Sequence, residues 1–167
     1  SANGFAFWDA QVKELWSEKG LSKSVNRATS LRNFLKMLLS IHPELNAHTK
    51  IQTLNELFKN LLNKGFLLLN FNLSLSSLPK NTEAKYWIPF HEVLLKKLRE
   101  KKIDHEQDMP TIILLGKIAE KVIQLPESQF YPSLIAEHPY NLSFITNPKI
   151  KNFFFEFQNF NYWTLLS

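Results

Sequence analysis

Three short apolar runs, each closed by a polar or glycine residue, constrain the fold of this chain more than any other feature. They are "FLLLN" at 66–70, "TIILLG" at 111–116 and "SLIAEHP" at 133–139. A short, uniformly apolar run that ends in a polar residue is typical of a parallel strand buried on both faces. Helix-forming stretches separate the runs, and strands that alternate with helices predict a parallel sheet covered on both sides.

Five further segments predict helices. Leucine and phenylalanine recur at helical spacing in 50–65, and Gly65 suits the C-cap of that helix. Pro89 stands near the expected start of a helix over 88–102, whose basic last turn suits the helix dipole. A third helix is expected over 29–40, with Thr29 or Ser30 as its N-cap. The remaining helical segments are 117–125 and 148–160.

The chain has 167 residues, of which 44% are hydrophobic, and this suits one domain with a real core. We therefore expect a single domain over 1–167, with a three-layer α/β/α fold and a central, mostly parallel sheet of about four strands flanked by helices. Ligands of such sheets bind beyond the carboxyl ends of the strands. Asn70, Gly116 and His138 stand at those ends.

Charge and cysteine content narrow the function further. The net charge of +5 favours polyanionic partners, nucleic acid first, although many basic proteins bind none. The absence of cysteine excludes disulfides, a thiol nucleophile and a thiolate zinc site, and it fits a reducing compartment. There is no signal-peptide pattern and no apolar run long enough to cross a bilayer. A phosphate or nucleotide binder is disfavoured because no glycine-rich loop joins a strand to a helix.

The same segments resemble the motifs of family 1 uracil-DNA glycosylases. "KGFLLLNFNLSL" resembles that family's strand and turn "GVLLLN-x-x-L-T-V", and "EHPYNLS" resembles its "HPSPLS" loop. "YWIPFHEVLLKKL" is similar to its "GW-x-x-F" helix start, "IILLGKIAEK" to "LLWG-x-x-A", and "TSLRNFLKML" to "PPSLRN-x-x-K-E-L". "SANGFAFW" and "NYW" resemble "QA-x-GL-x-FS" and "IDW". The matches keep their order and cover nearly the whole chain.

The resemblance implies a base-excision repair enzyme. Such an enzyme hydrolyses the N-glycosidic bond of a flipped-out deoxyuridine in single- or double-stranded DNA and releases uracil. It implies no metal, no cofactor and a monomer that does not bind membranes. It also places the protein in a bacterial cytosol, or in the nucleus of a host cell if the protein is viral.

Two residues are the implied centre of the site. His138 would be catalytic: as the glycosidic bond breaks, a neutral imidazole donates a hydrogen bond to the O2 of the departing uracil. Asn70 would recognise the base, because its amide pairs with the O4 and N3–H edge of uracil, a pattern that cytosine reverses. Each residue also has a purely structural alternative. His138 could be a core histidine that is hydrogen-bonded to the backbone, and Asn70 could be an asparagine that only caps the end of a strand.

The resemblance assigns four more residues. Phe7 would stack on the uracil ring, Leu142 would wedge into the base stack, and Ser30 and Ser143 would grip phosphates. Each has a plain alternative. Phe7 is one of 14 phenylalanines and could be core, Leu142 could fold back on its own loop, and Ser30 could be a helix cap.

Departures from the family pattern favour a second hypothesis. The family loop "GQDPYHG", with the water-activating aspartate, would lie upstream of Ser1, so we expect the N-terminal segment to be missing from this sequence. Tyr140 and Asn141 replace a Ser-Pro pair, and residues 9–27 are longer and more polar than the corresponding link. The alternative is a non-catalytic module that binds DNA or a protein partner. It is supported by Tyr140 and Asn141, and by Thr82, which falls where the family usually has a histidine. Leu115, in place of the tryptophan before Gly116, is a further departure.

The other histidines and one basic run are expected to be solvated. The histidines stand in or beside polar helices and loops, and the basic run matches no motif. They are His42, His48, His91, His105, Lys96, Lys97, Arg99, Lys101 and Lys102.

Overall fold

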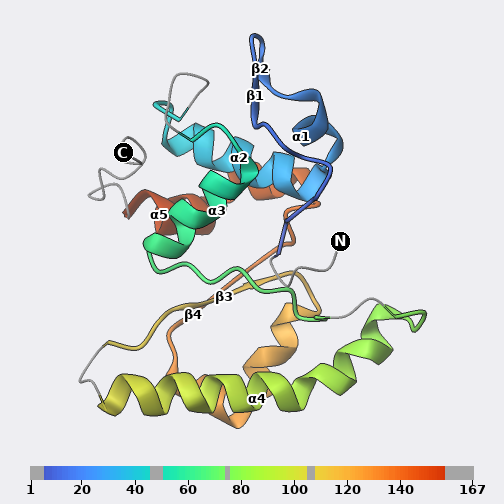
Figure 1. The fold of residues 1–167 in the computed structure, drawn as a ribbon. Coiled ribbons are helices and arrows are strands. Elements are labelled where there is room, and N and C mark those ends of the chain that lie inside the picture. The colour runs from blue at the N-terminus through green and yellow to red at the C-terminus, as the bar shows by residue number, and fades with distance from the viewer. Residues whose placement is uncertain (1–5, 46–50, 74–75, 105–107, 157–167) are drawn as a thin grey trace. The chain divides into compact units, whose positions relative to one another are not determined.

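A computed structural model describes residues 6–45, 51–73, 76–104 and 108–156 (Figure 1). These residues form two compact units. Unit 1 contains the described residues of 6–69 and 138–156, and unit 2 contains those of 70–137. Among the described residues, no helix is both long and apolar enough to span a membrane.

Unit 1 is mainly helical. Its strands form an antiparallel hairpin, in which Trp16 pairs with Leu21. A 3₁₀ helix, η3, packs with α1 and α5 against α2. The elements are β1 (Trp16–Ser17), β2 (Gly20–Leu21), α1 (Lys23–Arg27), α2 (Thr29–Ile41), α3 (Leu54–Asn63), η3 (Leu142–Thr146) and α5 (Pro148–Glu156).

Helix α2 supplies much of the core of unit 1. Leu31, Leu35 and Leu38 are buried at the spacing of one helical face, and Phe34 lies among them. Burying each such side chain contributes about 1.5–3 kcal/mol. The predicted N-cap is wrong: α1 ends at Arg27, and Ala28 occupies the cap position of α2. Among the described residues no side chain caps this helix, and Ser30 lies in its first turn.

Helix α3 confirms the prediction over 50–65 and begins with a capping box. The Thr53 hydroxyl accepts from the Glu56 N–H at 3.2 Å, and a Glu56 carboxylate oxygen accepts from the Thr53 N–H at 2.8 Å. The Gln52 N–H donates to the same oxygen, and these backbone hydrogen bonds lower the pKa of Glu56. Gly65 follows the C-cap with φ +87°, a conformation that glycine adopts without strain.

The strand predicted at 66–70 is wrong. Residues 66–69 join neither sheet of the described part, Leu69 forms an isolated β-bridge, and Leu67 is 54% exposed. The Phe66 ring instead stacks on Phe154 of α5, with centroids 5.3 Å apart. The Leu68 carbonyl accepts from the Ala6 N–H at 3.2 Å. An apolar run does not by itself say how far it is buried or which element it packs against.

Unit 2 contains the two strands that were predicted correctly. β3 (Ile112–Leu115) and β4 (Ser133–Ala136) are parallel, with Ile112 opposite Ser133 and Leu115 opposite Ala136. Within the described residues the strands form two separate two-stranded sheets, so the predicted sheet of about four strands is not found there. The segment predicted as a helix at 117–125 forms a 3₁₀ helix, η1 (Ala119–Gln124), which ends before Pro126.

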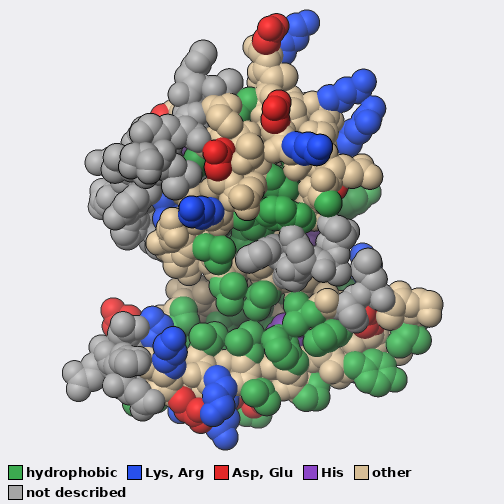
Figure 2. All heavy atoms as spheres, viewed as in Figure 1, with side chains coloured by type: hydrophobic (Ala, Val, Ile, Leu, Met, Phe, Trp, Pro, Cys, Tyr) green, Lys and Arg blue, Asp and Glu red, His purple; other side chains and the backbone are tan. Residues whose placement is uncertain are grey.

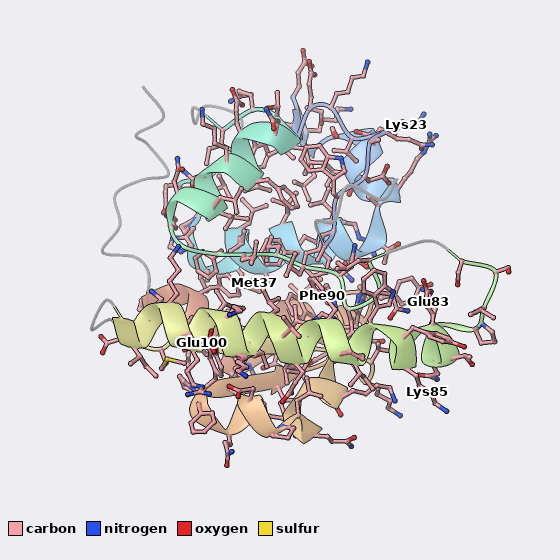
Figure 3. All side chains as sticks on the ribbon, turned by 60° about the horizontal axis from the view of Figure 1, so that its bottom comes forward. Lys23, Met37, Glu83, Lys85, Phe90 and Glu100 are labelled. Carbon is pink, nitrogen blue, oxygen red and sulfur yellow. The ribbon has the colours of Figure 1, made fainter. Side chains whose placement is uncertain are left out.

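Helix α4 (Lys80–Asp104) is the longest element of unit 2, and its predicted start is wrong (Figure 3). The Pro79 carbonyl accepts from the N–H groups of Thr82 and Glu83, so the helix begins well before Pro89. Pro89 lacks an N–H and leaves the Lys85 carbonyl without its helical donor. Both residues are exposed, so water can satisfy that carbonyl and the helix continues.

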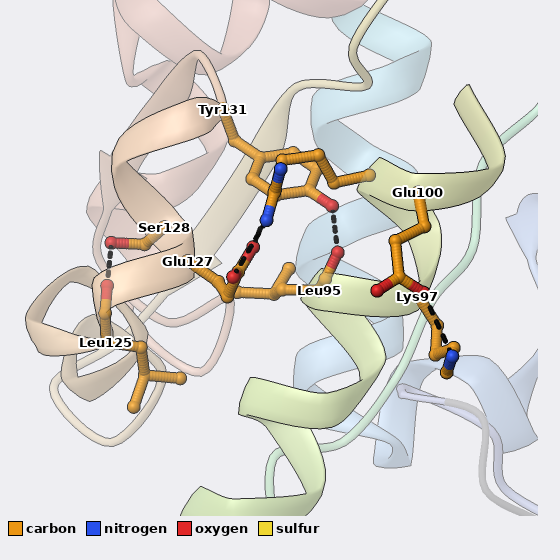
Figure 4. Close-up of polar contacts among 8 residues, drawn as sticks. Leu95, Lys97, Glu100, Leu125, Glu127, Ser128 and Tyr131 are labelled. Atoms are coloured by element: carbon orange, nitrogen blue, oxygen red, sulfur yellow. Dashed lines mark hydrogen bonds and ion pairs between the residues drawn. The ribbon is translucent and has the colours of Figure 1, made fainter. Parts of the chain in front are cut away.

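A second 3₁₀ helix, η2 (Pro126–Phe130), packs on α4 through polar contacts (Figure 4). Arg99 makes a bidentate ion pair with Glu127, at 2.7 and 3.0 Å, and its guanidinium lies 4.3 Å from the Phe130 ring centre. The Tyr131 hydroxyl donates to the Leu95 carbonyl. The prediction that Arg99 is solvated is therefore wrong, whereas Lys97, with its exposed partner Glu100, lies on a solvated face.

Two histidines expected in solvent are buried. In unit 2, His91 Nε2 donates to the Phe71 carbonyl at 2.8 Å, and burial lowers the pKa of His91. In unit 1, His42 Nδ1 lies 3.0 Å from a Glu44 carboxylate oxygen. Both were mispredicted because a polar neighbourhood in sequence does not reveal a buried backbone acceptor, which is the Phe71 carbonyl for His91 and the Phe154 carbonyl, 3.4 Å from Nε2, for His42. His48 and His105 lie outside the described residues.

Candidate active site

The centre of the site is a tight turn that opens at His138. The Asn141 N–H donates to the His138 carbonyl at 2.9 Å, which closes the turn. Pro139 is buried beneath it, whereas the side chains of His138 and Tyr140 are exposed. The turn therefore presents the imidazole at the surface, and the alternative of a core histidine is wrong.

A backbone hydrogen bond determines the tautomer of the neutral His138 imidazole. The Tyr140 N–H donates to His138 Nδ1 at 3.0 Å. A nitrogen that accepts a hydrogen bond carries no proton, so the neutral ring has its proton on Nε2. This is the tautomer in which Nε2 can donate to an electron-rich ligand atom.

The turn is anchored to α2 by a residue that sequence reasoning missed. Asn33 is fully buried, and its Nδ2 donates to the Pro139 carbonyl at 2.7 Å. The carbonyls of Tyr140 and Asn141 lie farther from it, at 3.3 and 3.5 Å. The only sequence signal was its place in "TSLRNFLKML", where no role had been assigned to it.

The structure brings Phe7 and His138 together. Their ring centroids are 6.1 Å apart, with an edge-on angle of 71°. Phe7 is half-buried and also stacks on the buried Phe34 at 5.4 Å, so it joins the edge of the core to the imidazole. Its φ is +66°, a left-handed conformation that costs a non-glycine residue about 1–2 kcal/mol. Such backbone strain gathers at functional sites.

Leu142 and Ser143 follow the turn and open η3. Leu142 is 68% exposed, so it does not fold back into the core, whereas Phe144 beside it is fully buried. Ser143 is also exposed. That Leu142 inserts into a base stack stays a prediction.

The fold resembles two solved structures of one protein. The crystal structure of the wild-type uracil-DNA glycosylase (UNG) from Nitratifractor salsuginis superposes with a TM-score of 0.76 and 34% identity over 91% of this chain. A point mutant of that UNG gives a TM-score of 0.76, with 35% identity over 90% of this chain. Neither a protein-family model nor a curated protein matches.

The chain resembles a uracil-DNA glycosylase in both its motifs and its fold. It spans 64% of the length of those two crystallised chains. The family resemblance of the motifs is thereby confirmed, and the α/β class with it.

The remaining site residues expected from the glycosylase family lie apart from the turn in sequence. Asn70 is exposed and stands at the first position of unit 2, after residues 66–69. That it faces His138 stays a prediction. Ser30 is half-buried in the first turn of α2, and its contact with phosphate, like that of Ser143, also stays a prediction.

The charged side chains around the hairpin of this glycosylase relative are mixed in sign. Figure 2 shows lysine and arginine side chains over the hairpin and α1, with acidic side chains among them. Lys23 extends outward from the start of α1 (Figure 3). The segment 9–27 therefore does not concentrate the positive charge of the chain. Its exposed charged residues include Lys13, Lys19, Lys23, Arg27, Glu14 and Glu18.

Proposed function

We propose that the protein releases uracil from DNA by hydrolysing the N-glycosidic bond of a flipped-out deoxyuridine. The observation that carries the proposal is the hydrogen bond from the Tyr140 N–H to His138 Nδ1. When the bond between C1′ and N1 breaks, its electron pair leaves with uracil and charge collects on O2. An imidazole with its proton on Nε2 stabilises that charge without first losing or gaining a proton.

Base recognition belongs to Asn70 in this proposal. Its amide carries a donor and an acceptor, which pair with O4 and N3–H of uracil. Cytosine reverses this pattern, and each buried polar group left without a partner costs about 1–3 kcal/mol. The exposed position of Asn70 makes it accessible to an extrahelical base.

Phe7 and Leu142 act on the flipped nucleotide from two directions. Phe7 supplies a flat apolar surface beside His138, and stacking of a base on such a ring contributes about 1–3 kcal/mol. Leu142 fills the space that the base vacates in the duplex. Flipping costs a few kcal/mol, which these contacts offset, and Ser30 and Ser143 hold the neighbouring phosphates.

The general base in this proposal is an aspartate upstream of Ser1. Water attacks C1′, its proton passes to that carboxylate, and uracil departs as an anion. Residues 1–167 then form one domain together with a preceding segment. We further propose a monomer that needs neither metal nor cofactor, in a bacterial cytosol or the nucleus of a host cell.

Release of free uracil from a uracil-containing oligonucleotide tests the proposal. The assay compares residues 1–167 with the same chain extended by its upstream reading frame, on single-stranded and duplex DNA. We expect the extended protein to release uracil and leave alkali-labile abasic sites. If neither form releases uracil although both bind the DNA, the non-catalytic module is the correct description.

A further inference from the structure

One peptide group in the turn, between Pro139 and Tyr140, is hydrogen-bonded from both sides. Its carbonyl oxygen accepts from Asn33 Nδ2 at 2.7 Å. Its N–H donates to His138 Nδ1 at 3.0 Å. The C=O and N–H of a trans peptide point in opposite directions, so Asn33 and His138 hold the two sides of a single rigid plane.

The orientation of the Asn33 amide follows from a second contact. Arg32 Nε lies 3.1 Å from Asn33 Oδ1, and a guanidinium only donates. The atom facing Arg32 is therefore oxygen, so the NH₂ group faces the turn. The atoms on that side are backbone carbonyls, which only accept. The contact with Arg32 and the contact with the turn therefore both place Oδ1 of Asn33 toward Arg32 and Nδ2 toward the turn.

This arrangement selects one orientation of the peptide. If the Pro139–Tyr140 plane turned over, its N–H would face the NH₂ group of Asn33, and its carbonyl would face His138 Nδ1. Both hydrogen bonds would be lost, and Nδ2 of the fully buried Asn33 would keep only the longer contacts to the Tyr140 and Asn141 carbonyls.

We propose that Asn33 is a positioning residue: by holding the Pro139 carbonyl it aims the Tyr140 N–H at His138 Nδ1 and keeps the imidazole proton on Nε2. Arg32 assists by fixing the orientation of the Asn33 amide. The structural part of this inference concerns unit 1 alone. Its catalytic consequence rests on the proposed function.

Nuclear magnetic resonance of the ¹⁵N-labelled chain tests the structural part directly. A scalar coupling between the Tyr140 amide nitrogen and His138 Nδ1 detects the N–H···N hydrogen bond, and hydrogen exchange measures its protection. The variants are Asn33→Asp, which keeps the shape but lacks the NH₂ group, and Asn33→Ser, which is uncharged and too short to reach the carbonyl. The control is Asn60→Ala, because Asn60 is a second buried asparagine of unit 1, on α3.

We expect wild type and Asn60→Ala to show the coupling and a single tautomer protonated on Nε2. Both Asn33 variants should lose the coupling, and the Tyr140 amide should exchange about tenfold faster or more. An unchanged coupling in either folded variant overturns the proposal. If neither variant folds, the measurement on the wild-type protein tests the proposal. A wild-type protein without the coupling, or with a mixture of imidazole tautomers, overturns the proposal as well.

Uracil release tests the catalytic consequence. Under single-turnover conditions, Asn33→Ser should slow uracil release about tenfold with little change in Kd for DNA. The reason is that the substitution alters only the direction of the hydrogen bond from the Tyr140 N–H to His138 Nδ1. In a His138→Ala background, Asn33→Ser should have no further effect, since the group it positions is gone. An equal loss in both backgrounds overturns the positioning role. A protein that releases no uracil at all contradicts the proposed function, while the coupling still decides the role of Asn33.

Discussion

The ring of Phe7 meets the ring of His138 edge-on, with centroids 6.1 Å apart, although 131 positions of the sequence separate the two residues. Phe34 of α2 lies behind Phe7, and Asn33 of the same helix holds the turn that carries His138. Helix α2 therefore supports both an aromatic surface and an imidazole of defined tautomer. A flat heterocyclic ring that can stack on an aromatic side chain and that develops negative charge fits such a pair of groups.

Replacing His138 should separate catalysis from binding. His138→Ala removes the donor to O2, and loss of one such donor typically costs about 10²–10³ in rate. Single-turnover release of uracil should fall by that factor, while fluorescence anisotropy shows nearly unchanged DNA affinity, because the exposed imidazole supports no core packing. A variant that releases uracil at the wild-type rate would remove His138 from the mechanism.

Leu142 should matter most when the target base is paired. Leu142→Ala removes the wedge, so release from duplex DNA should fall about tenfold, and single-stranded DNA should restore most of it because no stack has to be opened. Ile123→Ala is a matched control, since Ile123 is also an exposed aliphatic residue but lies in unit 2, on η1. Equal losses on both substrates would refute the wedge role.

Two substitutions of Phe7 should separate its ring from its backbone. Phe7→Ala removes the aromatic surface and keeps a Cβ at φ +66°, whereas Phe7→Gly removes both the ring and the strain. We expect the glycine variant to be more stable than the alanine variant by about 1 kcal/mol in urea unfolding. Uracil release should be equally impaired in both. A more stable alanine variant would show that the left-handed backbone carries no strain.

Sequence reasoning located the elements better than it located their partners. The runs around Leu114 and Ile135 form parallel strands as predicted, because each finds the other as its neighbour. The equally apolar run at 66–70 joins neither described sheet, since Phe66 packs against α5 instead. Local pattern indicates an apolar segment, but its burial and its pairing partner are properties of the whole chain.

In the candidate site, too, sequence reasoning identified individual residues but not the contacts that hold them. The motif resemblance pointed to Phe7 and His138, and the structure places their rings together. It gave no role to Asn33, because a buried asparagine on an apolar helix face looks like an interruption of that face. Its partner, the Pro139 carbonyl, lies 106 positions away and carries no side-chain signal. Contacts from side chain to backbone over such separations have no counterpart in sequence patterns.

The capping box of α3 should contribute measurably to stability. Thr53→Ala removes the hydroxyl that accepts from the Glu56 N–H, and losing such a cap costs about 1 kcal/mol. Urea unfolding at neutral pH should show this loss. Thr29→Ala, in the first turn of α2, is the control, because there Ala28 occupies the cap position and the expected loss is smaller. Equal losses would mean that the Thr53 hydroxyl does not act as a cap.

Lys64, at the C-cap of α3, should make stability depend on pH in the alkaline range. Burial lowers the pKa of Lys64 from 10.5 to about 8, and the carboxylate of Glu44 opposes this only in part. Between these two values the unfolded chain binds more protons than the folded chain, so the Lys64 contribution to the free energy of unfolding rises with pH. Below about pH 8 the folded chain carries the full cost of a partly buried charge.

The substitution Lys64→Met removes this cost while keeping an unbranched side chain of similar length. The variant should have a higher Tm than the wild type at pH 7, and the difference should shrink as pH rises through the window from about 8 to 10.5. Lys23→Met, on the exposed start of α1, is the control and should show no such trend. Thermal unfolding of the three proteins across this pH range decides the point. A constant difference in Tm between Lys64→Met and wild type would show that the Lys64 ammonium is not destabilised by the fold.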